Sequence, residues 1–314
     1  MVDLKIEVPD YFFDEEERWG HQIDRQMKEV WAVELDLFAE LKRVCDKYGL
    51  RLAANAGTIL GAVRHKGFIP WDDDLDFMMP REDYEVLCKV ASEEFKHPYF
   101  FENFHVDPHF IYGDAKLLNL DTTGYENPYL TKHGIFIDIF PLDAYIDDEQ
   151  LFEQQWNEAI KLFTQYQRVL TCSSFNYVRE KGISLPRRLA RLYYYLKLKL
   201  MRAKVGGPYQ KKLFAKFEEV CQRYNGKNDI AYIGELSFLQ KNDKTLKNDY
   251  DDLLMMDFEF TRIPIPEHYH EYLTMKYGDY QKPVKTGFAM HTFKVLDTGR
   301  PYTEVLKENG IKYE

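Results

Sequence analysis

Cysteine is scarce in this sequence, and so are positive charge and long apolar runs. The four cysteines of the 314 residues lie far apart with no CxxC pair, which argues against a zinc site and for reduced thiols in the cytoplasm. A net charge of −10 argues against a nucleic-acid partner. No stretch approaches the roughly 18 apolar residues of a membrane-spanning helix. The acidic N-terminal segment has neither the basic nor the apolar region of a signal peptide.

The order of periodic segments predicts an α+β fold. Helical spacing over 14–48 is followed by short segments with strand patterns, among them GIFIDIFPL at 134–142. From about 147 to 228 long helical patterns dominate, and strand character then returns. We therefore expect a catalytic core with a mixed sheet, formed by 1–146 and 229–314, and a helical insertion over 147–228.

The stretch GFIPWDDDLDFMMP, residues 67–80, places four aspartates between apolar flanks. Carboxylates this close repel one another, and their burial is costly unless cations or hydrogen bonds compensate. Because side chains at i and i+2 of a strand share a face, Asp74 and Asp76 would project together. Two carboxylates on a rigid strand form a hard-oxygen site suited to Mg²⁺ or Mn²⁺.

A third carboxylate, Asp138, is the only charge in the apolar strand GIFIDIFPL. A lone buried aspartate needs a partner, and a metal ion held jointly with Asp74 and Asp76 would supply one; a backbone cap or an arginine is the alternative. Upstream, Gly57 and Thr58 lie between a predicted strand and a short helix, where backbone N–H groups and a hydroxyl can hold phosphate oxygens. This order of motifs is typical of the nucleotidyltransferase fold.

The block AGTILGAVRHKGFIPWDDDLDFMMPREDYEVL at 56–87 closely resembles the LicD family of phosphotransferases, relatives of the fukutin-type enzymes. Two further blocks resemble the same family, GIFIDIFPLD at 134–143 and YLTMKYGDYQKP at 272–283. Ala56 departs from the glycine usual in that family, and Gln281 and Val284 depart from its usual methionine and proline. The last two differences bear on which donor is used.

The resemblance implies a metal-dependent transfer of a phospho-alcohol, typically phosphocholine from CDP-choline, with release of CMP. The acceptor implied is a hydroxyl of a bacterial surface glycan precursor, lipid-linked, of a lipopolysaccharide or teichoic acid; relatives use CDP-ribitol or CDP-glycerol. Such an enzyme is expected in the cytoplasm, peripheral on the inner face of the cell membrane. Two alternatives stay open: a nucleotidyltransferase that transfers the nucleotide itself, and a non-catalytic glycan-assembly binding module.

Within this hypothesis the aspartates take distinct roles. Asp74 and Asp76 hold the ion that bridges the donor diphosphate, Asp138 helps to hold a second ion at the acceptor hydroxyl, and Asp72 supports them. Asp73 is expected to be solvated or paired with Arg64.

Several other side chains are candidates for donor contacts. The cations expected to neutralise phosphates are Arg64, His65, Lys66 and Lys116, although Arg64 could instead form an ion pair with the aspartates. Trp71 and Tyr112 could contact a quaternary ammonium group, and His291 could reach the site, although most aromatics and lone histidines are structural.

The segment 181–216 contains 11 lysines and arginines and no acidic residue. As a helix, 187–204 carries a basic stripe beside an apolar one; the basic stripe comprises Arg188, Arg191, Tyr195, Lys199 and Arg202, and the apolar one Leu189, Leu192, Tyr193, Leu196, Leu200 and Ala203. A basic amphipathic helix predicts docking on an anionic membrane surface. Packing on the domain, or on another subunit, is the alternative.

Overall fold

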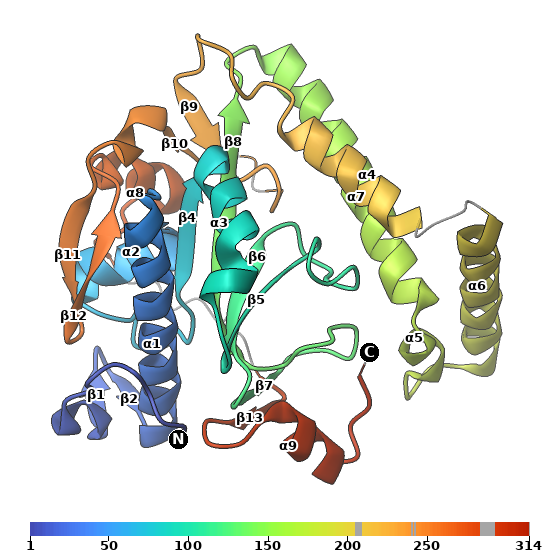
Figure 1. Ribbon diagram of the computed structural model, residues 1–314, viewed down its shortest axis with the longest axis horizontal. Coiled ribbons are helices and arrows are strands. Elements are labelled where there is room, and N and C mark those ends of the chain that lie inside the picture. The colour runs from blue at the N-terminus through green and yellow to red at the C-terminus, as the bar shows by residue number, and fades with distance from the viewer. Residues whose placement is uncertain (205–208, 240, 242, 283–292, 314) are drawn as a thin grey trace.

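The computed structural model describes residues 1–204, 209–239, 241, 243–282 and 293–313, and it is organised around one mixed sheet (Figure 1). The sheet strands are β3 (Ala53–Ala54), β4 (Asp76–Pro80), β5 (Tyr99–Asn103), β6 (Ala115–Asn119), β8 (Ile135–Tyr145), β9 (Tyr232–Gly234) and β10 (Lys244–Leu246). Three hairpins or strand pairs lie outside it: β1 (Glu16–Arg18) with β2 (His21–Ile23), β7 (Thr123–Tyr125) with β13 (Val295–Asp297), and β11 (Leu254–Phe258) with β12 (Thr261–Ile265).

The helices confirm the expected α+β class. They are α1 (Arg25–Tyr48), α2 (Ala56–Leu60), α3 (Arg81–Glu94), α4 (Glu149–Ser173), α5 (Phe175–Arg179), α6 (Leu185–Lys204), α7 (Tyr209–Cys221), α8 (Tyr269–Tyr277) and α9 (Tyr302–Glu308). Helix α1 begins at an Asp24 cap, whose carboxylate accepts from the Met27 backbone N–H at 2.8 Å. It ends at Gly49, whose left-handed φ of 65° suits glycine.

Strand β8 organises the sheet because it pairs with three others. Strand β4 runs parallel to it on one side, while β6 and β9 share its other side in antiparallel pairing. Helix α1 covers one face of this sheet, where the Phe38 ring stacks on that of Phe77 at a centroid distance of 4.9 Å. The Phe77 side chain therefore points toward α1. Because neighbouring residues of a strand point to opposite faces, Asp76 and the residues paired with it lie on the face away from α1.

Helices α4 to α7 occupy the segment for which long helical patterns are predicted, although the division of the chain into core and insertion stays a prediction. Helices α4 and α7 pack along each other (Figure 1). Their shared apolar cluster includes Trp156, Phe163, Tyr166, Phe214 and Phe217. Asn225, just beyond α7, donates to Asp143 of β8 at 2.9 Å, so a partly buried hydrogen bond joins the helical segment to the sheet.

Several predicted boundaries are wrong. The first helix begins at Arg25 rather than at 14, because Trp19 and Gly20 have positive φ and turn the chain into the β1–β2 hairpin. The segment 257–266 contains the end of β11 and the whole of β12, which form a hairpin rather than a single strand. Strand β5 and helix α9 have no counterpart among the predicted elements.

Candidate active site

Four charged side chains form a row across the sheet. Glu102 of β5 pairs with Lys116 of β6, Lys116 pairs with Asp138 of β8, and Asp138 pairs with Asp76 of β4. Residues that are direct partners on neighbouring strands point to the same face, so the four side chains lie side by side. Asp76 and Asp138, separated by about 60 positions in the chain, are therefore neighbours, as the metal hypothesis requires.

Lys116 lies in this row as the partner of Asp138. Its Nζ is 3.0 Å from Asp138 Oδ1 and 4.0 Å from Glu126 Oε2. Burial alone would lower the pKa of Lys116, but the carboxylates of Asp138 and Glu126 outweigh it and raise that pKa. The side chain is thus a fixed cation beside the aspartate pair, and its ion pairs are with carboxylates.

Asp72 lies close to the start of α2. Burial raises the pKa of the Asp72 carboxyl, and the neighbouring Asp74, to which it is hydrogen-bonded, raises it further. A Cβ added to Gly57 would lie 3.0 Å from Asp72 Oδ2, so glycine permits this close approach. The Thr58 hydroxyl oxygen accepts the Asp76 backbone N–H at 2.8 Å, which fixes the start of β4 and leaves the hydroxyl proton for another acceptor.

Asp73 is buried, so the expectation that it is solvated is wrong. Arg64 donates to the Tyr280 carbonyl oxygen at 2.7 Å and to His65 Nε2 at 2.9 Å, and so connects the first and third family-like blocks. Burial lowers the pKa of His65 to about 4, so that ring is neutral near pH 7 and offers a phosphate no positive charge. Lys66, in a left-handed conformation, is exposed.

The aromatic candidates lie in different surroundings. Tyr112 has its ring centroid 5.0 Å from Lys116 Nζ, which places it at the charged row. Trp71 is edge-on to the ring of His65 at 6.1 Å and to that of His21 at 6.3 Å. His291 lies outside the described residues.

Two glutamates that are not among the predicted site residues are buried near the aspartates. Glu34 of α1 is buried, its Oε2 atom has no hydrogen-bond partner among the described residues, and its pKa is raised by burial and then by Asp73 and Asp74. A signal for it exists in the sequence, since Glu34 lies three residues after Trp31 and so falls on the apolar face of its helix.

Glu235 follows β9 and has no comparable sequence signal. Its Oε1 accepts from Asn55 Nδ2 at 2.7 Å, and the Asn55 backbone N–H donates to the Asp76 carbonyl at 2.9 Å. The Tyr272 hydroxyl donates to Asn55 Oδ1 at 2.7 Å. Asn55 therefore holds Glu235 beside β4, and burial raises the pKa of Glu235 to about 7.

Replacing Glu235 with glutamine should make stability less dependent on pH. Between the ordinary pKa of 4.5 and the folded value of about 7, the folded protein keeps a proton that the unfolded chain releases, so wild-type stability falls as pH rises. Glutamine does not titrate. Urea titrations measure the free energy of unfolding of E235Q and of wild type, and the difference is taken as E235Q minus wild type. This difference should increase by up to about 3 kcal/mol from about pH 5 to pH 8. A difference that stays constant with pH would contradict the assignment.

The aspartates have the hard oxygen atoms that Mg²⁺ prefers, but the described residues contain no group of three or more His, Cys, Asp or Glu side chains placed to hold a metal ion. The same residues do contain an in-register pair, Asp76 and Asp138, and a hydrogen-bonded pair, Asp72 and Asp74. Since Mg²⁺ is commonly bound by one or two carboxylates together with substrate phosphates and water, this arrangement fits an ion that arrives with a nucleotide.

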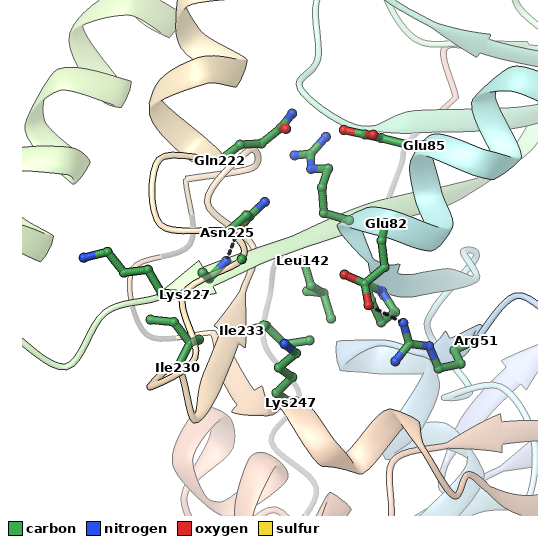
Figure 2. Close-up of a pocket in the computed structure, with 14 residues that line it drawn as sticks. Arg51, Glu82, Glu85, Leu142, Gln222, Asn225, Lys227, Ile230, Ile233 and Lys247 are labelled. Carbon is green, nitrogen blue, oxygen red and sulfur yellow. Dashed lines mark hydrogen bonds and ion pairs between the residues drawn. The ribbon is translucent and has the colours of Figure 1, made fainter.

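A separate pocket of about 200 Å³ lies at the other end of the two central strands, between Pro80 of β4 and the end of β8 (Figure 2). Its arginines are held by carboxylates, with Arg51 Nη2 2.6 Å from Glu82 Oε1 and Arg81 Nη2 2.6 Å from Asp143 Oδ2. None of the predicted site residues lines it. It is therefore distinct from the charged row.

Comparisons with known proteins agree with the resemblance seen in the sequence. Residues 49–175, which contain β4, β6 and β8, match the family model described as the LicD/FKTN/FKRP nucleotidyltransferase domain. The lipopolysaccharide cholinephosphotransferase LicD of Haemophilus influenzae is 26% identical over 272 residues, covering 82% of this chain and 91% of its own.

Two uncharacterized proteins align over shorter stretches. The one from Rickettsia typhi is 37% identical over 92 residues, 27% of this chain and 29% of its own. The one from Rickettsia prowazekii is 43% identical over 57 residues, 18% of this chain and 21% of its own. The aspartate strands lie inside the matched domain, and most of the chain aligns to a phosphotransferase, so both comparisons support the resemblance of this chain to the LicD family of phosphotransferases.

Proposed function

We propose that this enzyme transfers phosphocholine from CDP-choline to a hydroxyl of a cell-surface glycan precursor and releases CMP. The Haemophilus influenzae relative is named for cholinephosphate transfer to lipopolysaccharide, which supports this donor alcohol and this class of acceptor. A teichoic acid precursor is a second acceptor of the same chemistry. The observation that carries the proposal is the register of β4 with β8, which makes neighbours of Asp76 and Asp138.

In this proposal Asp74, Asp76 and Asp138 hold Mg²⁺ or Mn²⁺ together with donor phosphate oxygens. Asp72, whose carboxyl is hydrogen-bonded to that of Asp74, keeps the Asp74 side chain oriented. A bound divalent cation would neutralise the diphosphate and favour deprotonation of the acceptor hydroxyl. The described residues contain no group of three or more His, Cys, Asp or Glu side chains placed to hold an ion, so donor phosphate oxygens would have to complete the coordination.

The acceptor oxygen attacks the distal phosphorus of the diphosphate, a new phosphodiester bond forms, and the bond from that phosphorus to the bridging oxygen breaks. CMP leaves with the bridging oxygen, and the hydroxyl proton passes to a carboxylate of the row or to water. Lys116 provides a buried positive charge beside Asp138, where charge develops on the transferred group. Gly57 and Thr58 at the start of α2, with Arg64, His65 and Lys66, are the proposed donor phosphate contacts.

Incubation with Mg²⁺ and either CDP-choline, CDP-ribitol or CDP-glycerol tests the donor, with CMP release followed by chromatography. We expect CMP from CDP-choline, slowly by hydrolysis without an acceptor and faster with a glycan hydroxyl, and none after chelation of divalent ions. Pyrophosphate release from CTP would instead indicate a nucleotidyltransferase. No nucleotide turnover with any of the four compounds would favour a binding module.

We place the enzyme at the cytoplasmic face of the cell membrane, where a soluble CDP-alcohol and a lipid-linked acceptor can meet. Among the described residues, no helix combines the length and the apolar character needed to cross a bilayer. Attachment would therefore be peripheral in that part of the chain.

A further inference from the structure

The outer face of α6 carries an apolar strip that nothing in the described structure covers. The strip consists of Leu185, Leu189, Tyr193, Leu196 and Leu200, each between 51% and 69% exposed. At about 100° per residue these positions fall within about 80° of arc on the helix. Figure 1 shows α6 at the edge of the molecule, beyond α4 and α5. Soluble proteins rarely expose a contiguous apolar surface of this kind to solvent unless it binds a partner.

Contacts on the opposite face of α6 determine the rotation of the helix about its own axis. Leu198 packs against the apolar cluster of α4 and α7. The ring of Tyr195 lies 5.6 Å from that of Phe175, and Arg191 donates to the Tyr177 carbonyl at 2.9 Å. Because these contacts hold the inner face, the apolar strip points away from the rest of the protein.

Exposed cations border the strip on both sides. Arg188 and Lys199 lie along one edge and Lys197 along the other, and all three are exposed. The segment 181–216 contributes +11 to the total charge of −10, so the rest of the chain carries −21. Positive charge is thus concentrated where the apolar strip is exposed.

We propose that the outer face of α6 docks on an anionic lipid bilayer, with the apolar strip at the level of the acyl chains and Arg188, Lys197 and Lys199 among the headgroups. Charge selects this occupant, since a second copy would bring one basic strip against another, whereas an anionic surface complements it. The proposal refines the peripheral attachment suggested above but is independent of the chemistry, because binding can be measured without a donor.

Co-sedimentation of the full chain with vesicles tests the docking. We expect binding to vesicles of equal parts phosphatidylglycerol and phosphatidylcholine at least about tenfold tighter than to phosphatidylcholine alone, since each cation near the surface is worth roughly a fivefold gain. The double variant L189E/L196E should bind at least about 100-fold more weakly. K197E/K199E, which leaves the apolar strip intact, should bind at least about 25-fold more weakly.

Matched controls separate the surface from general effects. The variant L254E replaces an exposed leucine of β11 outside the strip. The variant K89E/K312E changes the net charge by the same amount as K197E/K199E, but at exposed lysines outside α6. Both controls should bind vesicles as wild type does. Circular dichroism checks that the variants remain folded. Equal binding to both vesicle types, or wild-type binding by both α6 variants, would overturn the proposal. So would a wild-type dimer without vesicles that L189E/L196E converts to a monomer, since the strip would then be an interface between copies.

Discussion

Replacing either Asp76 or Asp138 with asparagine should reduce CMP release from CDP-choline by roughly 100- to 1,000-fold. The change keeps the size of each side chain and removes the negative charge that would hold the divalent cation, and loss of one group that stabilises developing charge commonly has an effect of this size. Initial rates at saturating Mg²⁺ measure it. The two variants should behave alike because the residues are direct partners across β4 and β8.

A matched control is Asp257→Asn in β11, whose side chain is 78% exposed and belongs to a hairpin outside the central sheet. It should retain wild-type turnover. The cation requirement adds a second readout, since Asp76→Asn should need a higher Mg²⁺ concentration for half-maximal rate. Wild-type turnover in either Asp76→Asn or Asp138→Asn would show that the pair does not take part in the reaction.

The largest effect on stability is expected from Asp143→Ala. Asp143 is fully buried and accepts from Arg81 Nε at 2.8 Å, from Arg81 Nη2 at 2.6 Å and from Asn225 Nδ2 at 2.9 Å. Its removal leaves a buried guanidinium without its carboxylate partner, which typically costs 3–5 kcal/mol, so we expect a loss of about that size. Urea unfolding followed by tryptophan fluorescence measures it.

Two further variants show whether the ion pair is the cause. Asp46→Ala breaks the pair that Asp46 forms with Lys42 on the surface of α1, and exposed pairs of this kind contribute less than about 1 kcal/mol. The double variant Arg81→Met/Asp143→Leu removes both charges and should recover much of the loss, because no buried charge is left alone. A cost below about 1 kcal/mol for Asp143→Ala would mean that water or another group replaces the carboxylate.

The sequence was informative about which residues belong to the strands and less so about how the strands meet. The alternation of DLDFMM and the lone charge in GIFIDIFPL correctly place Asp76 and Asp138 within strands. Asp74, predicted to lie on the same strand as Asp76, precedes β4 in the structure, so that part of the prediction is wrong. Their register could not be predicted, because it depends on parallel pairing between segments about 60 residues apart and on the turns around β8. A shift of one residue would have put Asp138 on the face covered by α1.

Other parts of the site depend on contacts that no local pattern encodes. Glu235 is brought to β4 by the side chain of Asn55, 180 positions away, and neither residue lies in a distinctive motif. The ion pair of Lys116 with Asp138 likewise follows from strand pairing. Long-range pairing of this kind decides which buried charges become partners.

For helix α6, sequence periodicity predicts the amphipathic character but not which residues of each stripe are exposed. Spacing correctly indicates a basic amphipathic helix, but Arg191 and Tyr195, assigned to the basic stripe, face α5 in the structure. Leu192, assigned to the apolar stripe, is only partly exposed, while Leu185 joins the exposed strip. The rotation of a helix follows from what it packs against, which the isolated pattern does not contain.

A crystal structure of the enzyme with Mn²⁺ and CDP-choline tests most directly whether the aspartates form the catalytic centre. Anomalous scattering locates Mn²⁺ independently of the nucleotide. We expect a peak at about 2.0–2.2 Å from carboxylate oxygens of Asp76 and Asp138 and in contact with the diphosphate. A bound nucleotide whose diphosphate lies elsewhere, with no anomalous peak at these two residues, would contradict the proposed site.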